Sequence, residues 1–287
     1  MSDMRYKLDN PGFETVLRLL NYDILNEYDE NELKKIRKIC EQILSTSGNV
    51  SLGKTLEMTK EDIKIFFLEM IKSFNNKDAL EYYKKRLEDM DIYFRKYIKK
   101  EGAQINLGIK DEKIICGPIL LPARKHIREY DLLSFSHEMG HVACYENKKK
   151  SIEEYFEFSE VIPILFEYFS SLKLQRRNPY NYFSINRLSC ERKAAELVLD
   201  ALSYLENASE KAKNNCVMPT LIEGSKYLYS SDTAFQIIDL LKTDKDEVIK
   251  GIGEIIIGDK SVKDMTEHFG IKSNCKRLIK EYERRIT

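Results

Sequence analysis

The stretch Leu132–Val142 reads LLSFSHEMGHV, and it predicts a buried helix that carries a metal site. His137 and His141 are four residues apart, so a helix places both imidazoles on one face, one turn above the other. Glu138 projects beside them, where it can take a proton from an attacking water. This HExxH pattern is typical of zinc hydrolases, in which the two histidines share one Zn²⁺.

The residues around the motif indicate that its helix is buried. Apolar side chains cover most of its circumference, which is typical of a helix inside a core, and they are Leu132, Leu133, Phe135, Met139, Val142 and Ala143. Buried histidines and a buried glutamate need partners, which a metal supplies. This context disfavours the alternative of two surface histidines with a chance glutamate. Gly140 costs about 1 kcal/mol relative to Ala in a helix, so it indicates close packing or access to the metal.

A catalytic zinc takes three protein ligands and keeps a fourth position open. No histidine occurs in the six residues after His141, and the next is the distant His268. A carboxylate on a following helix is therefore expected, and the candidates are Glu153, Glu154, Glu157, Glu160 and Glu167. Glu160 is favoured because the apolar run VIPILF follows it, and a carboxylate entering a core needs a partner. Glu167 lies two turns further on the same face, either as a hydrogen-bond partner of a ligating histidine or as a surface residue.

Composition excludes several classes of protein. The chain has 287 residues, 43% of them hydrophobic and 33% charged, and its 47 basic and 47 acidic residues balance. Without a basic excess, nucleic acid is not an expected partner. No apolar run is long enough for a membrane span, and the N-terminal sequence MSDMRYKLDNPGF lacks the apolar region of a signal peptide, so we expect a cytoplasmic protein. Six scattered cysteines without a CxxC pair predict reduced thiols.

Periodicity predicts a mainly α-helical protein with one small β-element just before the HExxH helix. Residues 12–99 are expected to be helical, with a loop at 46–56 and a last helix that runs from Asn75 or Asn76 to Tyr97. Strands are expected at 103–109 and 113–119. Later helices are expected at 129–146, 151–176, 186–207, 225–242, 245–257, 261–269 and 273–285. We expect residues 1–100 to form a helical region that covers the cleft, and residues 101–287 to form the catalytic, zincin-like region.

The apolar run Ile119-Leu120-Leu121 lies between Pro118 and Pro122. Proline is tolerated at a sheet edge better than at its centre, so an edge strand is expected here. An extended peptide could add to such an edge by main-chain hydrogen bonds. The alternative is a core strand without a ligand, and both stay open. A lone histidine at 126, between strand and helix, is expected to be structural.

Three segments resemble the thimet oligopeptidase and oligoendopeptidase F family of zinc metallopeptidases. Leu132–Val142 is similar to the active-site helix of that family. Phe158–Phe169, FSEVIPILFEYF, resembles the helix in which two glutamates stand seven apart and the first binds zinc. The resemblance therefore implies that Glu160 is the third ligand and Glu167 an outer partner. Tyr227–Phe235, YLYSSDTAF, resembles the segment whose tyrosine helps to stabilise the tetrahedral intermediate, which implies Tyr227 or Tyr229, with Tyr227 preferred.

The resemblance covers roughly residues 100–270 and has departures. The connection from His141 to Glu160 is a few residues shorter than is usual in the family. The family has a histidine and several glycines ahead of the tyrosines, where this chain offers only Gly224. Most members are also about twice as long, so limits on substrate size do not carry over.

The sequence thus predicts a zinc metalloendopeptidase with one Zn²⁺ per chain, oligopeptide substrates and Glu138 as general base. Two alternatives belong to other classes. The first is an inactive pseudopeptidase that binds peptides, and the second is a small HExxH protease that cuts one regulatory protein. Intact Glu138 disfavours the first, because binding zinc needs only the ligands.

Overall fold

The computed structural model describes residues 30–45, 53–95, 104–110, 113–122, 126–146, 158–174, 176–205 and 218–286. The helix expected before residue 30 and most of the loop expected at 46–56 lie outside these residues. The first residues of the helix expected at 151–176 also lie outside them, together with the candidates Glu153, Glu154 and Glu157.

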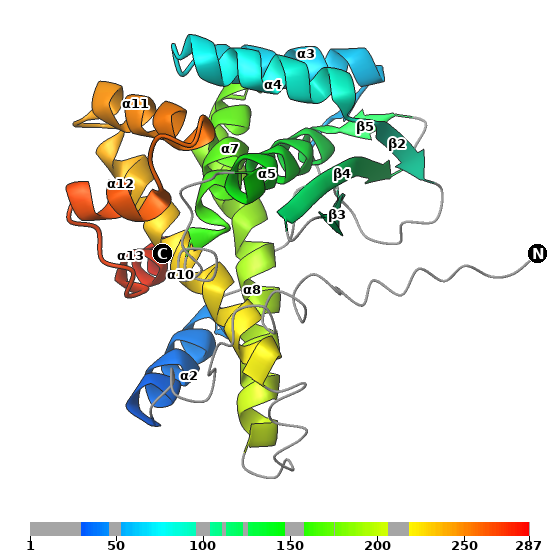
Figure 1. The fold of residues 1–287 in the computed structure, drawn as a ribbon. Coiled ribbons are helices and arrows are strands. Elements are labelled where there is room, and N and C mark those ends of the chain that lie inside the picture. The colour runs from blue at the N-terminus through cyan, green and yellow to red at the C-terminus, as the bar shows by residue number, and fades with distance from the viewer. Residues whose placement is uncertain are drawn as a thin grey trace, which may run out of the picture.

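The fold is mainly helical, as predicted, and most helices of the second half lie near the predicted positions. The helices expected to begin at 186 and 225 each begin seven residues earlier, at Pro179 and Met218. The described helices are α2 (Glu30–Leu44), α3 (Lys60–Lys72), α4 (Lys77–Asp89), α5 (Glu129–Glu146), α7 (Val161–Lys173), α8 (Pro179–Leu205), α10 (Met218–Leu240), α11 (Lys245–Ile256), α12 (Val262–His268) and α13 (Lys276–Ile286). Figure 1 shows α5 and α7 at the centre, with α3 and α4 above them and α11 to α13 on the left. The long helices α8 and α10 run side by side below the centre.

The described residues also form five strands: β1 (Thr55–Leu56), β2 (Ile92–Arg95), β3 (Gln104–Lys110), β4 (Lys113–Pro122) and β5 (Ile127–Arg128). β1 and β5 pair as an antiparallel ribbon. The other three form a sheet of order β2-β4-β3, in which β4 is parallel to β2 and antiparallel to β3. The two strands predicted on either side of the polar residues 110–112 are confirmed as β3 and β4.

The prediction of one helix that reaches Tyr97 is wrong for the residues after Asp89. Its start is right, since the Asn76 side chain accepts a hydrogen bond from the Ala79 amide at 2.9 Å and caps α4. α4 ends at Asp89, however, because Met90 is extended and the chain continues as β2. Ile92 and its aromatic neighbours favour a strand, and pairing with β4 outweighs the helical spacing that they also satisfy.

The prediction that residues 119–121 form an edge strand is also wrong, because they lie in β4, the central strand. The sheet accommodates Pro118 through an irregularity in its pairing with β3, where the register shifts between Ile105 and Leu107. On the other side, the pairing with β2 begins only at Ile119 and reaches Pro122 at the last pair. Neither proline therefore has to donate a hydrogen bond within a regular ladder.

α5 and α7 pack against each other in the core. Phe67, Tyr83, Phe135 and Phe166 pack ring to ring with centres 5.0–5.9 Å apart, which joins α3 and α4 to this helix pair. The Tyr83 hydroxyl donates a hydrogen bond to the Met139 carbonyl oxygen of α5 at 2.9 Å. This bond gives the buried phenol a partner and links α4 to the motif helix. The HExxH helix is thus buried, as its apolar circumference predicts.

Gly140 allows α5 and α7 to approach closely. A Cβ added to Gly140 would lie 2.5 Å from the Cα of Pro163 and 2.7 Å from its N. These are backbone atoms, which cannot rotate out of the way as the end of a side chain can. Pro163 itself is tolerated because it lies in the first turn of α7, where a backbone N–H has no partner within the helix. Close packing, one of the two roles predicted for Gly140, is confirmed.

We expect Gly140→Ala to lower the free energy of unfolding by about 1–3 kcal/mol, the range for overpacking a core. Gly251→Ala is the matched control, because Gly251 lies within α11 and an added Cβ would meet only the Met265 side chain, at 3.6 Å or more. That substitution should gain up to about 1 kcal/mol from helix propensity. Urea unfolding of both variants tests the pair, and a Gly140→Ala protein as stable as the wild type would contradict the close approach.

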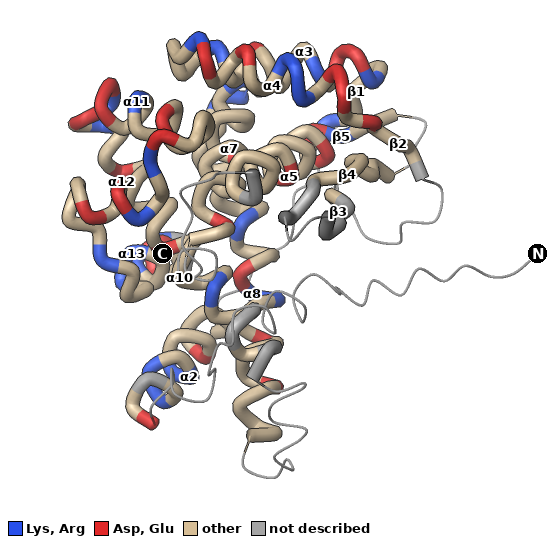
Figure 2. The backbone as a smooth tube through the Cα atoms, viewed as in Figure 1, with Lys and Arg blue, Asp and Glu red and all other residues tan. Residues whose placement is uncertain are grey.

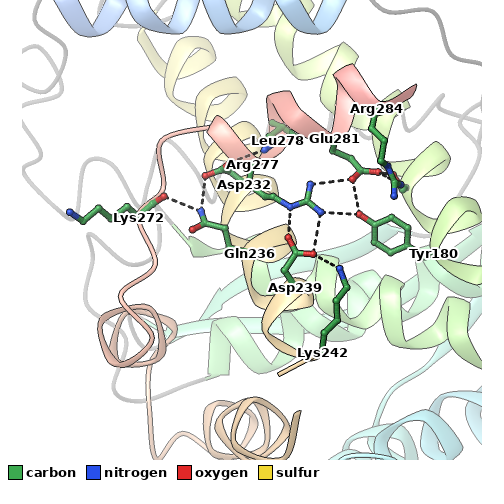
Figure 3. A network of polar contacts seen from close by, with 11 residues as sticks. Tyr180, Asp232, Gln236, Asp239, Lys242, Lys272, Arg277, Leu278, Glu281 and Arg284 are labelled. Atoms are coloured by element: carbon green, nitrogen blue, oxygen red, sulfur yellow. Dashed lines mark hydrogen bonds and ion pairs between the residues drawn. The ribbon is translucent and has the colours of Figure 1, made fainter. Parts of the chain in front are cut away.

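The C-terminal helix α13 is held against α10 and α8 by a polar network (Figure 3). Asp232, which is fully buried on α10, accepts hydrogen bonds from the backbone amides of Asn274 and Leu278 at 3.2 and 2.8 Å. Arg277 pairs with Asp239 and, at 3.1 Å, with Glu281, and Glu281 accepts a hydrogen bond from the Tyr180 hydroxyl at 2.7 Å. This network holds α10 against α13 and α8. α10 also carries residues near the site described below.

Acidic and basic residues alternate over the outer helices α3, α4, α11 and α12 (Figure 2), in keeping with their equal numbers in the sequence. Within the described ranges, no helix is both long enough and apolar enough to cross a membrane. Five cysteines in the part of the chain that the structure describes are free thiols, and four of these are buried, as their scattered positions predict.

Candidate metal centre

Three side chains meet in a cluster: His137 and His141 of α5, and Glu160, the residue directly before α7. The Nε2 atoms of the two histidines are 3.1 Å apart. The Glu160 Oε2 atom lies 3.2 Å from Nε2 of His137 and 3.4 Å from Nε2 of His141. The short connection after His141 therefore still brings Glu160 to both imidazoles.

These distances fit a zinc ion. A tetrahedral Zn²⁺ with bonds of about 2.0–2.2 Å separates neighbouring ligand atoms by about 3.3–3.5 Å, close to all three measured separations. The Glu160 carboxylate is 2% exposed, and its Oε2 atom accepts no well-aligned hydrogen bond. A buried carboxylate oxygen between two imidazole nitrogens needs a cation, and this set of nitrogen and oxygen donors is one that zinc binds.

Glu167 lies two turns along α7, on the same face as Glu160, and its Oε1 atom is 2.7 Å from Nδ1 of His137. It is buried, so the surface position considered from the sequence is wrong. A carboxylate this close to Nδ1 favours the tautomer with the proton on Nδ1, which leaves the lone pair of Nε2 for a metal. This geometry suits the role of outer partner that the resemblance implies.

Arg187 of α8 holds Glu167 in turn. Its Nη1 atom lies 3.1 Å from Glu167 Oε1, its Nη2 donates to Ser231 Oγ at 3.4 Å, and its Nε lies 3.7 Å from Glu191. Arg187 is 1% exposed, and Glu191 accepts a further hydrogen bond from the Tyr282 hydroxyl at 2.9 Å. A chain of buried polar contacts thus runs from the C-terminal helix to the ring of His137, and it fixes the orientation of that ring.

The buried charges around the cluster shift the pKa values of His137, Glu160 and Glu167. Burial alone would lower the pKa of His137, but Glu160 and Glu167 outweigh it and raise the pKa to about 10. Burial would likewise raise the pKa of Glu160, yet the two histidines and Lys226 hold it well below its usual range. The pKa of Glu167 is lowered against the effect of burial, chiefly by Arg187. The carboxylates are thus held ionised, and a metal ion that binds the His137 ring has to displace a proton from it.

Glu138 is next to the cluster and faces the sheet. Its Oε2 atom accepts a hydrogen bond from the Ile105 amide of β3 at 3.1 Å. Burial is the largest cause of its shifted pKa, which rises to about 7, with the Glu160 carboxylate adding to the rise and His137 opposing it. A carboxyl group that exchanges its proton near neutral pH suits general acid–base chemistry.

The other residues predicted from the sequence are not among the three that form the cluster. Tyr227 and Tyr229 are half-buried on α10, and the Tyr227 ring lies beside the ammonium of Lys226, with 5.6 Å between Nζ and the ring centre. His126 lies 3.9 Å from Glu57, outside the cluster, and His268 pairs with Glu247 on the surface at 2.8 Å.

Sequence reasoning missed Arg187 and Lys226. A signal existed for Arg187, because Phe183, Arg187, Glu191, Ala194 and Val198 recur at helical spacing and so place a charged pair on the apolar face of α8. For Lys226 the sequence offers only its position beside Tyr227. The structure places its Nζ 3.8 Å from Glu160 Oε1, in a side chain that is 7% exposed.

The fold is that of structures described as oligoendopeptidase F. A crystal structure from Bacillus anthracis str. Ames, provisionally assigned as an oligoendopeptidase F, matches 97% of this chain with a TM-score of 0.56 at 16% identity. A second structure with the same provisional assignment, at 3.1 Å resolution, matches 95% with a TM-score of 0.62 at 14% identity. This chain spans 62% and 60% of their lengths. No protein-family model and no curated protein matches the sequence.

Fold and site together define a class: a mainly helical, oligoendopeptidase-F-like fold in which an HExxH helix and a following glutamate form a candidate metal centre. At these identities the comparison establishes the fold, and the sequence resemblance to this family agrees with it.

We expect Glu167→Ala to weaken zinc binding by about 10–100-fold, the usual cost of removing an outer partner of a ligating histidine. Without the carboxylate, the ring of His137 loses the contact that orients it. Competition with a chromophoric chelator gives the affinity. Glu69→Ala is a control, because Glu69 pairs with Lys72 on the exposed face of α3 and should leave the affinity unchanged. Unchanged affinity in Glu167→Ala would contradict the role of Glu167.

Proposed function

We propose that the protein is a zinc-dependent metallopeptidase that hydrolyses peptide bonds within oligopeptides. The observation that carries this proposal is the near-tetrahedral spacing of the His137, His141 and Glu160 donor atoms, with the Glu138 carboxylate on the same helix beside them. A coincidental cluster would not need this spacing, whereas a zinc site does.

A zinc ion held by these residues would polarise the scissile carbonyl and lower the pKa of a water molecule. Glu138 accepts the proton of the attacking water and delivers it to the leaving amine. Glu167 and Arg187 keep the ring of His137 in place while this happens. Tyr227 or Tyr229 donates a hydrogen bond to the developing oxyanion, a contact that is typically worth about 3 kcal/mol.

The substrate extends along β3. Among the described strands β3 ends the sheet, and its Ile105 amide faces Glu138. A peptide that adds to this edge is bound by its main chain, and its scissile bond is brought to the base. Main-chain recognition tolerates many side chains, so we expect broad sequence preference among oligopeptides.

A digest of a mixed peptide library, followed by mass spectrometry, tests the proposal. We expect the wild-type protein with zinc to cut many unrelated oligopeptides at internal bonds, and chelator treatment to stop this. If nothing is cut although zinc is bound, the chain is a peptide-binding pseudopeptidase. If the library stays intact while one cellular protein is cut at a single site, the chain is a dedicated regulatory protease.

A further inference from the structure

Arg187 of α8 lies at the centre of a buried network that connects the C-terminal helix to the metal centre. Each nitrogen of its guanidinium faces a different side chain, at 3.1 Å for Nη1 and Glu167, 3.4 Å for Nη2 and Ser231, and 3.7 Å for Nε and Glu191. The second oxygen of Glu191 accepts a hydrogen bond from the Tyr282 hydroxyl of α13 at 2.9 Å. We call Tyr282, Glu191, Arg187 and Glu167 the Arg187 network.

The network ends on a side chain of the metal centre. The Glu167 oxygen that faces Arg187 is Oε1, and the same atom lies 2.7 Å from Nδ1 of His137. A movement of Arg187 therefore moves the atom that orients the His137 ring. The four side chains of the network are between 1% and 8% exposed, so water does not readily replace a partner that is lost.

Arg187 is shared between two carboxylates, Glu167 on one side and Glu191 on the other. Glu191 also receives hydrogen bonds from the hydroxyl groups of Ser231 and Tyr282. Loss of the Tyr282 hydroxyl would leave one oxygen of a buried carboxylate without its donor. Glu191 would then attract the guanidinium more strongly and draw it away from Glu167.

We propose that Tyr282 is a positioning residue of the metal centre, and that the docking of α13 through its hydroxyl raises the zinc affinity of the site. This inference rests on the proposed function, because that function requires zinc at His137. Tyr282 acts through Arg187 and Glu167, which hold the His137 ring in the orientation that a metal needs. Coupling between two sites is reciprocal, so zinc binding should in turn strengthen the docking of α13.

The substitution Tyr282→Phe in the full chain tests the proposal, because it removes one hydroxyl and keeps the buried ring. We expect zinc affinity, measured by competition with a chromophoric chelator, to fall by about five- to tenfold, the low end of the usual range for coupling between sites. In a Glu167→Ala protein the same substitution should change the affinity by less than about twofold, because the path to His137 is already interrupted. A merely structural effect would lower the affinity equally in both proteins.

Tyr180→Phe is the matched control. The Tyr180 hydroxyl donates to Glu281 of α13 at 2.7 Å (Figure 3), so this substitution also removes a hydrogen bond that holds α13, but outside the Arg187 network. Its zinc affinity should equal that of the wild type. If Tyr282→Phe is unfolded by circular dichroism, Glu191→Gln takes its place, since glutamine keeps the shape of the side chain and removes the charge that faces Arg187.

Hydrogen exchange of the backbone amides measures the reverse effect, independently of peptidase activity. Saturating zinc should slow exchange in α13, relative to α11, more strongly in the wild type than in Tyr282→Phe. Equal relative slowing in the two proteins would contradict the coupling.

Three affinity results would also overturn the proposal: a zinc affinity of Tyr282→Phe within about twofold of the wild type, an equal loss with and without Glu167, or an equal loss in Tyr180→Phe. A wild-type protein that binds zinc but cuts no peptide would contradict the proposed function and not the coupling. A wild-type protein that binds no zinc would contradict both.

Discussion

Glu138→Gln should abolish peptide hydrolysis and leave the bound zinc in place. The amide cannot accept the proton of the attacking water, and general base catalysis typically contributes about 10²–10⁴-fold. We expect kcat to fall by at least about 10³-fold for this reason. The Glu138 side chain accepts the Ile105 amide hydrogen bond, and the carboxamide oxygen of Gln can accept it as well, so the fold should not change.

Kinetics on a quenched fluorescent oligopeptide, with zinc measured on the same sample, check this expectation. Glu267→Gln on the exposed side of α12 is the control for a lost surface carboxylate, and it should keep full activity. Substantial hydrolysis by zinc-loaded Glu138→Gln would show that another group is the base. Loss of zinc in this variant would show instead that Glu138 belongs to the ligands.

Glu160→Ala should weaken zinc binding more than any change outside the three ligands. The substitution removes one of the three donor atoms at tetrahedral spacing and leaves the two imidazoles without the carboxylate that they face. We expect a loss of more than about 100-fold, the upper end for outer partners, and no measurable hydrolysis at micromolar zinc.

Comparison with Glu167→Ala distinguishes a metal ligand from an outer partner of a ligand. Both glutamates contact His137, but Glu160 meets its Nε2 and Glu167 its Nδ1. Zinc affinity should therefore fall in the order wild type, Glu167→Ala, Glu160→Ala. The reverse order would exchange the roles of the two residues. Full affinity in Glu160→Ala would move the third ligand elsewhere, with Glu167 and Glu157 the next candidates.

The parts of the fold that could be predicted are those set by local sequence. Apolar spacing and caps such as Asn76 placed most helices, and the polar residues 110–112 placed the hairpin of β3 and β4. The errors concern long-range pairing. Residues 92–95 satisfy a helix and a strand equally well, and only contact with β4 decides between them. Pro118 led to the prediction of an edge strand at 119–121. The register shift in β3 that accommodates its missing N–H depends on a partner strand and cannot be predicted from local sequence.

The metal centre was more predictable than its surroundings. His137, Glu138 and His141 follow from spacing within one helix, and Glu160 from the apolar run behind it. Helical spacing places Arg187 on the apolar face of α8, but the carboxylates that Arg187 and Lys226 meet depend on how α8 and α10 pack around α7. A buried basic residue distant in sequence can be assigned to the metal centre only when the structure shows which carboxylate it faces.

Zinc content per chain tests the central claim most directly. The protein is purified after expression with added zinc, dialysed against metal-free buffer and measured by plasma mass spectrometry beside a His137→Ala, His141→Ala double variant. We predict about one zinc per wild-type chain, which a strong chelator removes, and close to none in the double variant. A folded wild-type protein that holds no zinc, or a double variant that holds as much as the wild type, would contradict the account.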